Sequence, residues 1–406
     1  MPATATHNDT PSTSRFPSAA AARALPRDLR GIRLHDVPVP DIDGSTVGVL
    51  EDPRRGHLVA CVRVEGGSFA MAPAREQEQR LNRWGSLVAT IAQSSSIIRR
   101  VGFVSRSIPS DSNRQLDYFE SAGDLDAGAE VRSSYLELLQ RYERTADQRE
   151  VLVWIACDRP GGKALDDRLA QLAGEVSRLC GLLGRAQIHV TQVLDRIDLA
   201  LAIRAAYDPW GRPDRLAYAR GIREDAPERI GDLLEIAPSD VDPRWHELRA
   251  DRGLHRTAWV KQWPRTEVGA LFLMPLVVNP NVVRTVAWVA QLEDPSASLN
   301  DINAQAIDAR SDQMALGRMQ QRPTITRQQK WAGVFARERE LGAGHARILH
   351  NAYVTTSVFG DDVRALDQAW ERTRQNAAAS QLQLQVLARR QAQAITLTMP
   401  LGRGIR

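Results

Sequence analysis

VLVWIAC, at residues 151–157, is the stretch of sequence that decides the fold. It is a nearly continuous apolar run, which is typical of a strand that lies in the centre of a sheet and is buried on both faces. Three further strands are predicted around it, and amphipathic helices fill two of the intervals. These strands lie near residues 58–64, 97–105 and 188–193, and the helices near residues 74–93 and 164–183.

The same order of elements returns in the second half of the chain. Strands are predicted near residues 256–262, 282–290, 346–358 and 382–387, and helices near residues 268–276 and 361–378. Each half reads strand, helix, strand, helical insertion, strand, helix, strand, which is the split βαβ or ferredoxin-like order. The predicted fold is therefore α+β, with two tandem ferredoxin-like lobes. Each lobe is expected to have an antiparallel sheet of about four strands, with helices on one face.

The predicted lobes are separated by segments of different composition. A tail rich in Ala, Thr, Ser and Pro is expected to be disordered, and a charged segment with poor periodicity is expected to connect the lobes. The predicted divisions are the tail 1–30, the first lobe 31–207, the connector 208–254 and the second lobe 255–406, whose helical hairpin insertion spans 298–341.

The basic residues of this chain are almost entirely arginine. Net charge is +4 over 406 residues, and Lys occurs only at Lys163, Lys261 and Lys330. A GC-rich genome is one interpretation of this bias. Phosphate or lipid-headgroup binding is another, because the guanidinium group makes forked contacts that Lys cannot make. No run of Arg is dense enough to favour the second interpretation.

No catalytic or cofactor motif is found in the sequence. The stretch from Gly161 to Ala164 (GGKA) lacks the first Gly of a nucleotide-binding loop, and it has Ala where Ser or Thr would hold magnesium. The eight histidines and three cysteines do not have metal-ligand spacing, and no nucleophile motif is present. Carboxylates at predicted helix starts, such as Asp195 and either Asp361 or Asp362, are expected to cap those helices. We therefore expect no catalytic residue, no cofactor, no metal site and no enzyme activity.

Aromatic residues are the best candidates for a binding role. Nine tryptophans are present, and those on predicted core faces are Trp84, Trp154, Trp259, Trp288 and Trp370. Trp263 lies at the end of a predicted strand beside Arg265, which is a pattern suited to anchoring a protein partner. Trp331 and Phe335 lie in the Arg-rich insertion, where apolar residues flanked by Arg are typical of a partner-binding helix. These four residues, Trp263, Arg265, Trp331 and Phe335, are the candidate partner-binding site.

Several stretches together resemble a known family. They are residues 66–69 with the predicted helix 76–84, HRTAWVKQWPRTEV at 255–268, RTVAWV at 284–289, the segment 337–345 with the strand 353–355, and LTMPLGRG at 397–404. This pattern resembles actinobacterial proteins associated with conjugative type IV secretion, which are encoded with a small PrgI-type membrane protein and a large secretion ATPase. The second lobe is also similar to the N-terminal, non-ATPase region of the TrbE/CagE-type secretion ATPases.

The resemblance implies a structural role in DNA transfer by conjugation. It implies a non-catalytic docking component that engages the secretion ATPase and the PrgI-type protein at the cytoplasmic face of the membrane. Family members usually begin with membrane-spanning helices, whereas no segment here is long and apolar enough, so membrane association is expected to run through a partner. A second copy of the chain is a further candidate partner. The alternative function is a nucleic-acid-binding module of a mobile element, which is not favoured because the strand aromatics fall in core-like runs.

Overall fold

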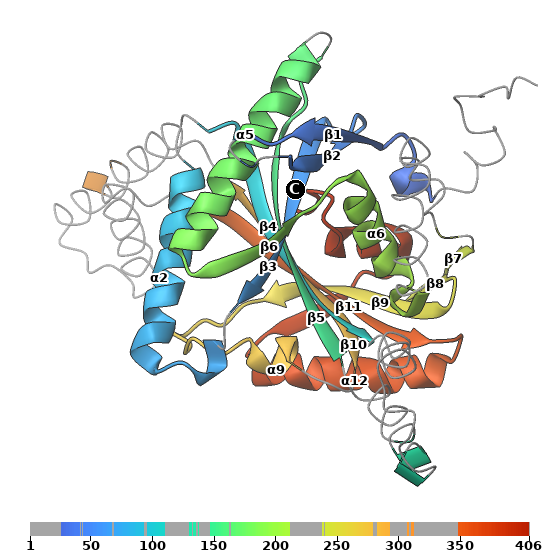
Figure 1. Ribbon diagram of the computed structural model, residues 1–406. Coiled ribbons are helices and arrows are strands. Elements are labelled where there is room, and N and C mark those ends of the chain that lie inside the picture. Colours follow the sequence, from blue (N-terminus) through green and yellow to red (C-terminus); the bar gives the residue numbers. More distant parts are fainter. Residues whose placement is uncertain are drawn as a thin grey trace, which may run out of the picture.

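One continuous antiparallel sheet organises the computed structural model of this protein (Figure 1). The structure describes residues 26–40, 44–66, 69–92, 96–109, 147–161, 164–211, 240–278, 282–292 and 348–405, together with a few isolated positions. Twelve strands of the described chain belong to the sheet, and its main path runs β1-β2-β3-β5-β4-β10-β11-β9-β8-β7. Their bounds are β1 Arg33–Pro38, β2 Thr46–Asp52, β3 His57–Gly66, β4 Ile98–Pro109, β5 Asp147–Asp158, β6 Ile188–Val193, β7 Val241–Pro243, β8 Leu248–Ala250, β9 Gly253–Gln262, β10 Val283–Leu292, β11 Ile348–Phe359 and β12 Gln383–Val386.

The two halves of the sheet have the same pairing order. In the first half the order is β6-β3-β5-β4, and in the second half it is β12-β9-β11-β10, with every pair antiparallel. β5, which contains the apolar run 151–157, lies between β3 and β4 as a central strand should. The antiparallel α+β architecture predicted from the sequence is therefore present.

The two halves join along β4 and β10, the outermost strand of each half. These strands pair antiparallel over seven registered positions, from Arg106 opposite Thr285 to Arg100 opposite Gln291. The expectation of a separate sheet of about four strands in each half is therefore wrong. The physical reason is that each half leaves one long edge strand with unpaired backbone groups, and pairing the two edges satisfies both.

Helices cover both faces of the sheet, so the expectation of helices on one face only is also wrong. The helical elements are η1 Arg27–Leu29, η2 Phe69–Met71, α2 Ala74–Ile91, α5 Ala164–Arg185, α6 Arg196–Tyr207, η3 Pro209–Gly211, α9 Met274–Val277, α12 Val363–Ala379, α13 Gln391–Ala394 and η5 Ile395–Thr398. α2, α5, α9 and α12 pack on one face, which we call the helical face. α6, η5 and the C-terminal residues pack on the opposite face.

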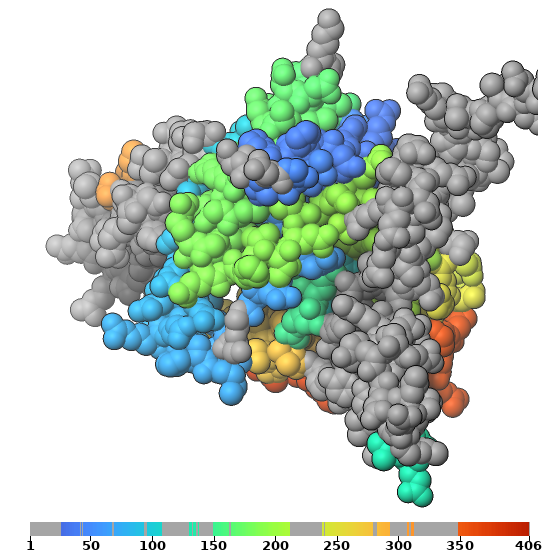
Figure 2. Space-filling view, in the orientation of Figure 1, coloured from blue at the N-terminus to red at the C-terminus, as the bar shows by residue number. Residues whose placement is uncertain are grey.

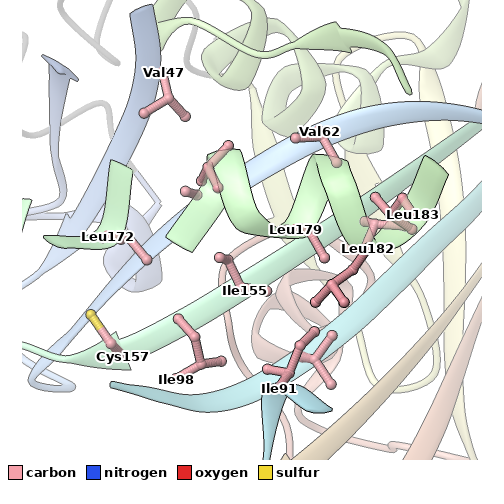
Figure 3. Packing of buried hydrophobic residues seen from close by; sticks show 14 of the residues in the cluster. Val47, Val62, Ile91, Ile98, Ile155, Cys157, Leu172, Leu179, Leu182 and Leu183 are labelled. Atoms are coloured by element: carbon pink, nitrogen blue, oxygen red, sulfur yellow. The ribbon is translucent and has the colours of Figure 1, made fainter. Parts of the chain in front are cut away.

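Strand alternation divides the core between these faces. Leu58, Ala60 and Val62 of β3 point to the helical face, while Val59 and Cys61 point to the other. Leucines at helical spacing on α5 complete the first core, as the amphipathic pattern of residues 164–183 predicts. Figure 3 shows these layers meeting, with labelled residues Val47, Val62, Ile91, Ile98, Ile155, Cys157, Leu172, Leu179, Leu182 and Leu183.

The opposite face is crossed by the end of the chain. Residues 399–405, which we call the strap, run over strands of both halves. The Leu401 carbonyl oxygen lies 2.9 Å from Nε2 of His57, and the Gly402 carbonyl accepts a hydrogen bond from Arg100 at 2.6 Å. Gly402 has φ +63°, and a Cβ there would lie 2.8 Å from Val59, so the close approach of the strap requires glycine.

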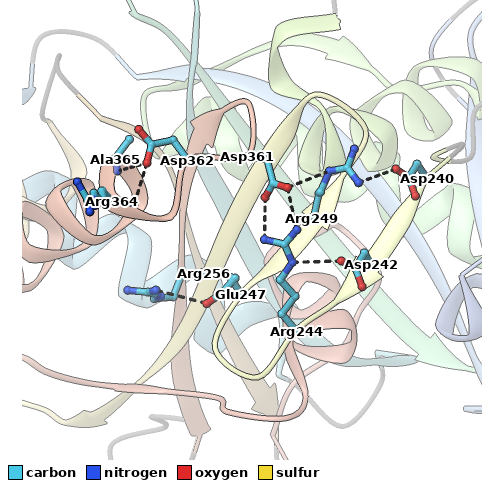
Figure 4. A network of polar contacts seen from close by, with 10 residues as sticks. All are labelled: Asp240, Asp242, Arg244, Glu247, Arg249, Arg256, Asp361, Asp362, Arg364 and Ala365. Carbon is cyan, nitrogen blue, oxygen red and sulfur yellow. Dashed lines mark hydrogen bonds and ion pairs between the residues drawn. The ribbon is translucent and has the colours of Figure 1, made fainter.

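The connector 208–254 ends in the short hairpin β7-β8, which extends the sheet beyond β9. Arg244 of this hairpin donates forked hydrogen bonds to Asp361 at 2.7 and 2.8 Å, next to the N-cap Asp362 of α12 (Figure 4). These bonds raise the pKa of Arg244 and lower that of Asp361. Because the Asp361 carboxylate is exposed to solvent, the pair orients the hairpin and adds little stability.

Capping residues lie where the sequence predicts them. Asp195 accepts from the Asp198 amide at the start of α6, and Asp362 accepts from the Arg364 and Ala365 amides at the start of α12. The helix predicted at 268–276 is shorter than expected, since only Met274–Val277 is α-helical. Proline fits best in the first turn of a helix, because it has no amide hydrogen to donate to the preceding turn. Pro275 is the second residue of this helix, so the helix begins directly before it.

Trp154 tests the central position of β5. Its side chain is 2% exposed, and its ring crosses over Gly102 of β4, where a Cβ would also lie 2.5 Å from the Trp288 carbonyl oxygen. We expect Trp154→Ala to lower the free energy of unfolding by about 3–5 kcal/mol, because a large ring is lost from a closed core. Urea unfolding measures this. The control Trp245→Ala removes a ring that is 53% exposed, and an equal loss in both variants would contradict the buried position.

Candidate partner-binding surface

Aromatic side chains line the helical face where the two halves of the sheet join. Trp288 of β10 stacks on Phe103 of β4, with ring centroids 5.7 Å apart and planes at 22°. Trp84 of α2 meets Trp288 edge to face, with centroids 6.4 Å apart. Offset and edge-to-face pairs of this kind stabilise beyond the area they bury. The junction is thus held by side chains as well as by the β4–β10 backbone ladder.

The aromatic line continues to Trp263, just beyond the end of β9. Its ring lies edge to face with His350 of β11 at 4.9 Å between centroids, and His350 in turn lies 6.3 Å from Trp288. We call the set Trp84, Phe103, Trp263, Trp288 and His350 the aromatic seam. Its four Trp and Phe side chains are half-buried, and His350 is exposed. A half-buried aromatic keeps one face available for a partner.

Apolar side chains extend the seam along α2. Leu81, one helical turn before Trp84, is 45% exposed, and Met71 in the preceding η2 is 86% exposed. Figure 2 shows α2 in light blue at the lower left and the α9 segment in yellow-orange near it. An exposed apolar residue one helical turn from a half-buried aromatic, as Leu81 is from Trp84, suits an interaction surface.

The four residues predicted to bind a partner have different outcomes. Trp263 is a member of the aromatic seam, and Arg265 is exposed two residues away. Trp331 and Phe335 lie outside the described residues, so their predicted role stays a prediction. The sequence predicts that Trp288 lies in the core, and it does not predict that this residue belongs to the aromatic seam. Its neighbour across the β4–β10 ladder is aromatic Phe103, but that pairing could not be read from either strand alone.

A buried Ser–His pair in the second half is structural. Nδ1 of His255 lies 2.8 Å from Oγ of Ser357, and Nε2 lies 2.8 Å from the Tyr207 carbonyl oxygen. His255 is 0% exposed and Ser357 is 5% exposed, so neither side chain can reach a substrate. Burial lowers the pKa of His255 to about 4. The imidazole therefore stays neutral at physiological pH and links β9, β11 and the end of α6.

Two of the three cysteines are equally inaccessible to a substrate. Cys61 and Cys157 are buried, and burial raises the pKa of both thiols, to about 12 for Cys157. A protonated, inaccessible thiol is a poor nucleophile. Within the described residues, no three His, Cys, Asp or Glu side chains are grouped so that they could hold a metal ion. In the same part of the chain, no helix has the length and apolar character needed to cross a membrane.

Comparison with known proteins gives no assignment for this site. No family model matches the chain, and no curated protein matches it.

The buried His255 makes stability depend on pH. Its pKa is about 4 in the folded chain and about 6.5 when exposed, so below pH 6.5 the unfolded chain binds a proton that the folded chain does not. Stability from this group is complete above pH 6.5 and is lost as the pH falls toward 4. Between pH 7 and pH 5 the loss is about 2 kcal/mol.

His255→Gln should remove that part of the pH dependence, since Gln does not titrate. Urea unfolding at pH 7 and pH 5 measures it, with His246→Gln as the control at an exposed position. If His255→Gln and the unchanged chain lost the same stability between these pH values, the buried neutral imidazole would be ruled out.

Proposed function

We propose that this chain is a non-catalytic structural and docking component of a conjugative type IV secretion complex. In this proposal it engages the secretion ATPase and a PrgI-type membrane protein at the cytoplasmic face of the cell membrane. The observation that carries the proposal is the origin of the aromatic seam. Trp84, Trp263 and Trp288 all come from stretches that resemble the secretion family, namely 76–84, 255–268 and 284–289.

The repeated strand order supports the proposal at the level of the fold. The orders β6-β3-β5-β4 and β12-β9-β11-β10 both follow the ferredoxin-like scheme, in which the fourth strand lies beside the first and the third lies between the first and second. We therefore interpret the halves as two ferredoxin-like lobes fused through β4 and β10. A rigid platform of this kind suits a docking role, because it holds a surface that spans both lobes in a fixed geometry.

The chemistry of the seam suits a protein partner. Trp is among the residues that contribute most to protein interfaces, and the exposed Arg265 could form ion pairs at the rim. A base-stacking function has less support. Such sheets present exposed aromatics on central strands, whereas Trp154 is buried and Phe103 and Trp288 are only half-buried and stack on each other.

The proposed contact with the ATPase includes Trp331 and Phe335 in the insertion. We expect the double change Trp331→Ala and Phe335→Ala to abolish co-purification of the secretion ATPase from cells. Circular dichroism and the melting temperature of the isolated chain should stay close to those of the unchanged chain, because an interface residue adds little to the fold of its own chain.

A matched control removes a Trp and a Phe elsewhere. Trp245→Ala with Phe359→Ala deletes rings that are 53% and 63% exposed, and ATPase capture should persist. A third variant, Trp263→Ala with Arg265→Ala, tests the seam itself and should weaken capture. Capture that survives both the Trp331/Phe335 and the Trp263/Arg265 changes would overturn the proposed interface. Unfolding of the Trp331/Phe335 variant would show that those residues are core.

A further inference from the structure

A cavity of about 460 Å³ lies beneath the strap, on the face opposite the aromatic seam. Its floor comes from both halves of the sheet, with Arg100 of β4 and Gln291 of β10 in register across the junction and Tyr353 on the next strand, β11. His57 at the start of β3 and Arg403 of the strap complete the polar wall. The volume falls within the range of about 300–1,000 Å³ that is usual for small-molecule sites.

The charge of this wall is one-sided. Arg55, Arg100 and Arg403 line the cavity, and none of its described lining residues is Asp or Glu. Asp52 lies behind the wall, where it accepts from Arg403 at 2.8 Å and pairs with Arg55 at 4.0 Å. Three guanidinium groups and no described carboxylate therefore line the cavity itself, which is a lining suited to an anion.

Two buried side chains of the wall have polar atoms without hydrogen-bond partners. Arg403 is 3% exposed, and its Nε and Nη1 atoms have no acceptor in the structure. His57 is 1% exposed, and its Nδ1 has no partner either. Since the Leu401 carbonyl oxygen can only accept, Nε2 of His57 carries the proton and Nδ1 is left as an acceptor. Burial lowers the pKa of His57, so the neutral form with its bare Nδ1 prevails.

We propose that the cavity beneath the strap binds a phosphate monoester through Arg55, Arg100 and Arg403. Forked guanidinium groups bind phosphate oxygens with charge-assisted hydrogen bonds. A phosphate group also fits the wall better than a carboxylate. Its several oxygens serve more than one arginine, and an O–H of the monoprotonated phosphate, or of a sugar that bears it, supplies the donor that Nδ1 of His57 lacks. Leu397 and Ile405 offer apolar contact to the remainder of the ligand.

A ligand in this cavity would connect parts of the chain that lie far apart in the sequence. Arg100 binds the strap through Gly402, and the Tyr353 hydroxyl accepts a hydrogen bond from the Ile405 amide at 3.4 Å. A bound phosphate would therefore contact the first half, the second half and the strap at once. Anything that binds the folded chain alone raises its apparent stability.

Isothermal titration of the full chain with inorganic phosphate, AMP and acetate tests the proposal. We expect AMP and phosphate to bind and acetate to bind more weakly. Arg55→Gln with Arg100→Gln should weaken AMP binding about tenfold or more, since it removes two charge-assisted contacts. The matched control is Arg54→Gln with Arg99→Gln, which changes the preceding residue in each case, and neither of these lines the cavity. It should bind AMP as the unchanged chain does.

Vesicle co-sedimentation separates the two sources of a phosphate monoester. Retention on phosphatidic acid vesicles but not on phosphatidylcholine vesicles, lost in Arg55→Gln with Arg100→Gln, would assign the ligand to a lipid headgroup. AMP binding without vesicle retention would assign it to a soluble compound. No binding of phosphate, AMP or phosphatidic acid overturns the proposal, as does acetate binding as tightly as phosphate.

The Arg100 variant also loses a hydrogen bond to the strap, so a second variant is needed that keeps the strap contacts. Melting temperatures show whether the double variant folds, and Arg55→Gln alone leaves both the Arg100–Gly402 and the Ile405–Tyr353 hydrogen bonds in place. This second variant should also weaken AMP binding relative to the unchanged chain. Equal affinity in the two chains would contradict the assignment of the cavity.

Discussion

The backbone ladder between β4 and β10 is the constraint on which the rest of the structure depends. Each strand is the last of its own half, and seven registered positions turn the two halves into one sheet. The ladder sets the distance between the halves at that of neighbouring strands, which is about 4.8 Å. On the helical face this brings Trp288 onto Phe103 and against Trp84. On the other face it brings Arg100 beside Gln291 beneath the strap. Both candidate binding regions are therefore products of one junction.

The strap reinforces the junction from the opposite side. Its hydrogen bonds reach His57 and Arg100 in the first half and Tyr353 in the second, over separations of 344, 302 and 52 residues. Contacts of such range close long loops of the chain, and the entropy of loop closure opposes their formation. The close approach depends on Gly402 and Gly404, where a Cβ would lie 2.8 Å from Val59 and from Val289 respectively. A side chain at either position would therefore force the strap or the sheet side chains to shift.

Local patterns in the sequence predicted the individual strands and helices, but they did not predict that β4 pairs with β10. The apolar run 151–157 predicted a central strand because a strand that is buried on both faces is apolar at nearly every position. Asp195 predicted a helix start because capping is a contact between near neighbours. No comparable pattern shows which edge strand pairs with which, because the backbone N–H and C=O groups that form the pairing are the same in every strand. Gly102 was the available signal, because a glycine inside a strand often marks a close approach, and here the Trp154 ring occupies the space of its side chain. The sequence could not predict that Arg403 and His57 line the same cavity, because the two residues lie far apart in the chain and share no motif.

Hydrogen exchange at the junction tests this account most directly. Alternate amides of residues 285–291 in β10 bond to β11 and to β4, as expected for a strand paired on both sides. If β4 and β10 form a continuous ladder, both sets of amides should exchange only on global unfolding, with the same free energy as the central amides of β5. If the halves were separate sheets, the set directed to β4 would exchange rapidly, like the amides of an exposed edge strand. Protection of one set without the other would therefore contradict the single sheet.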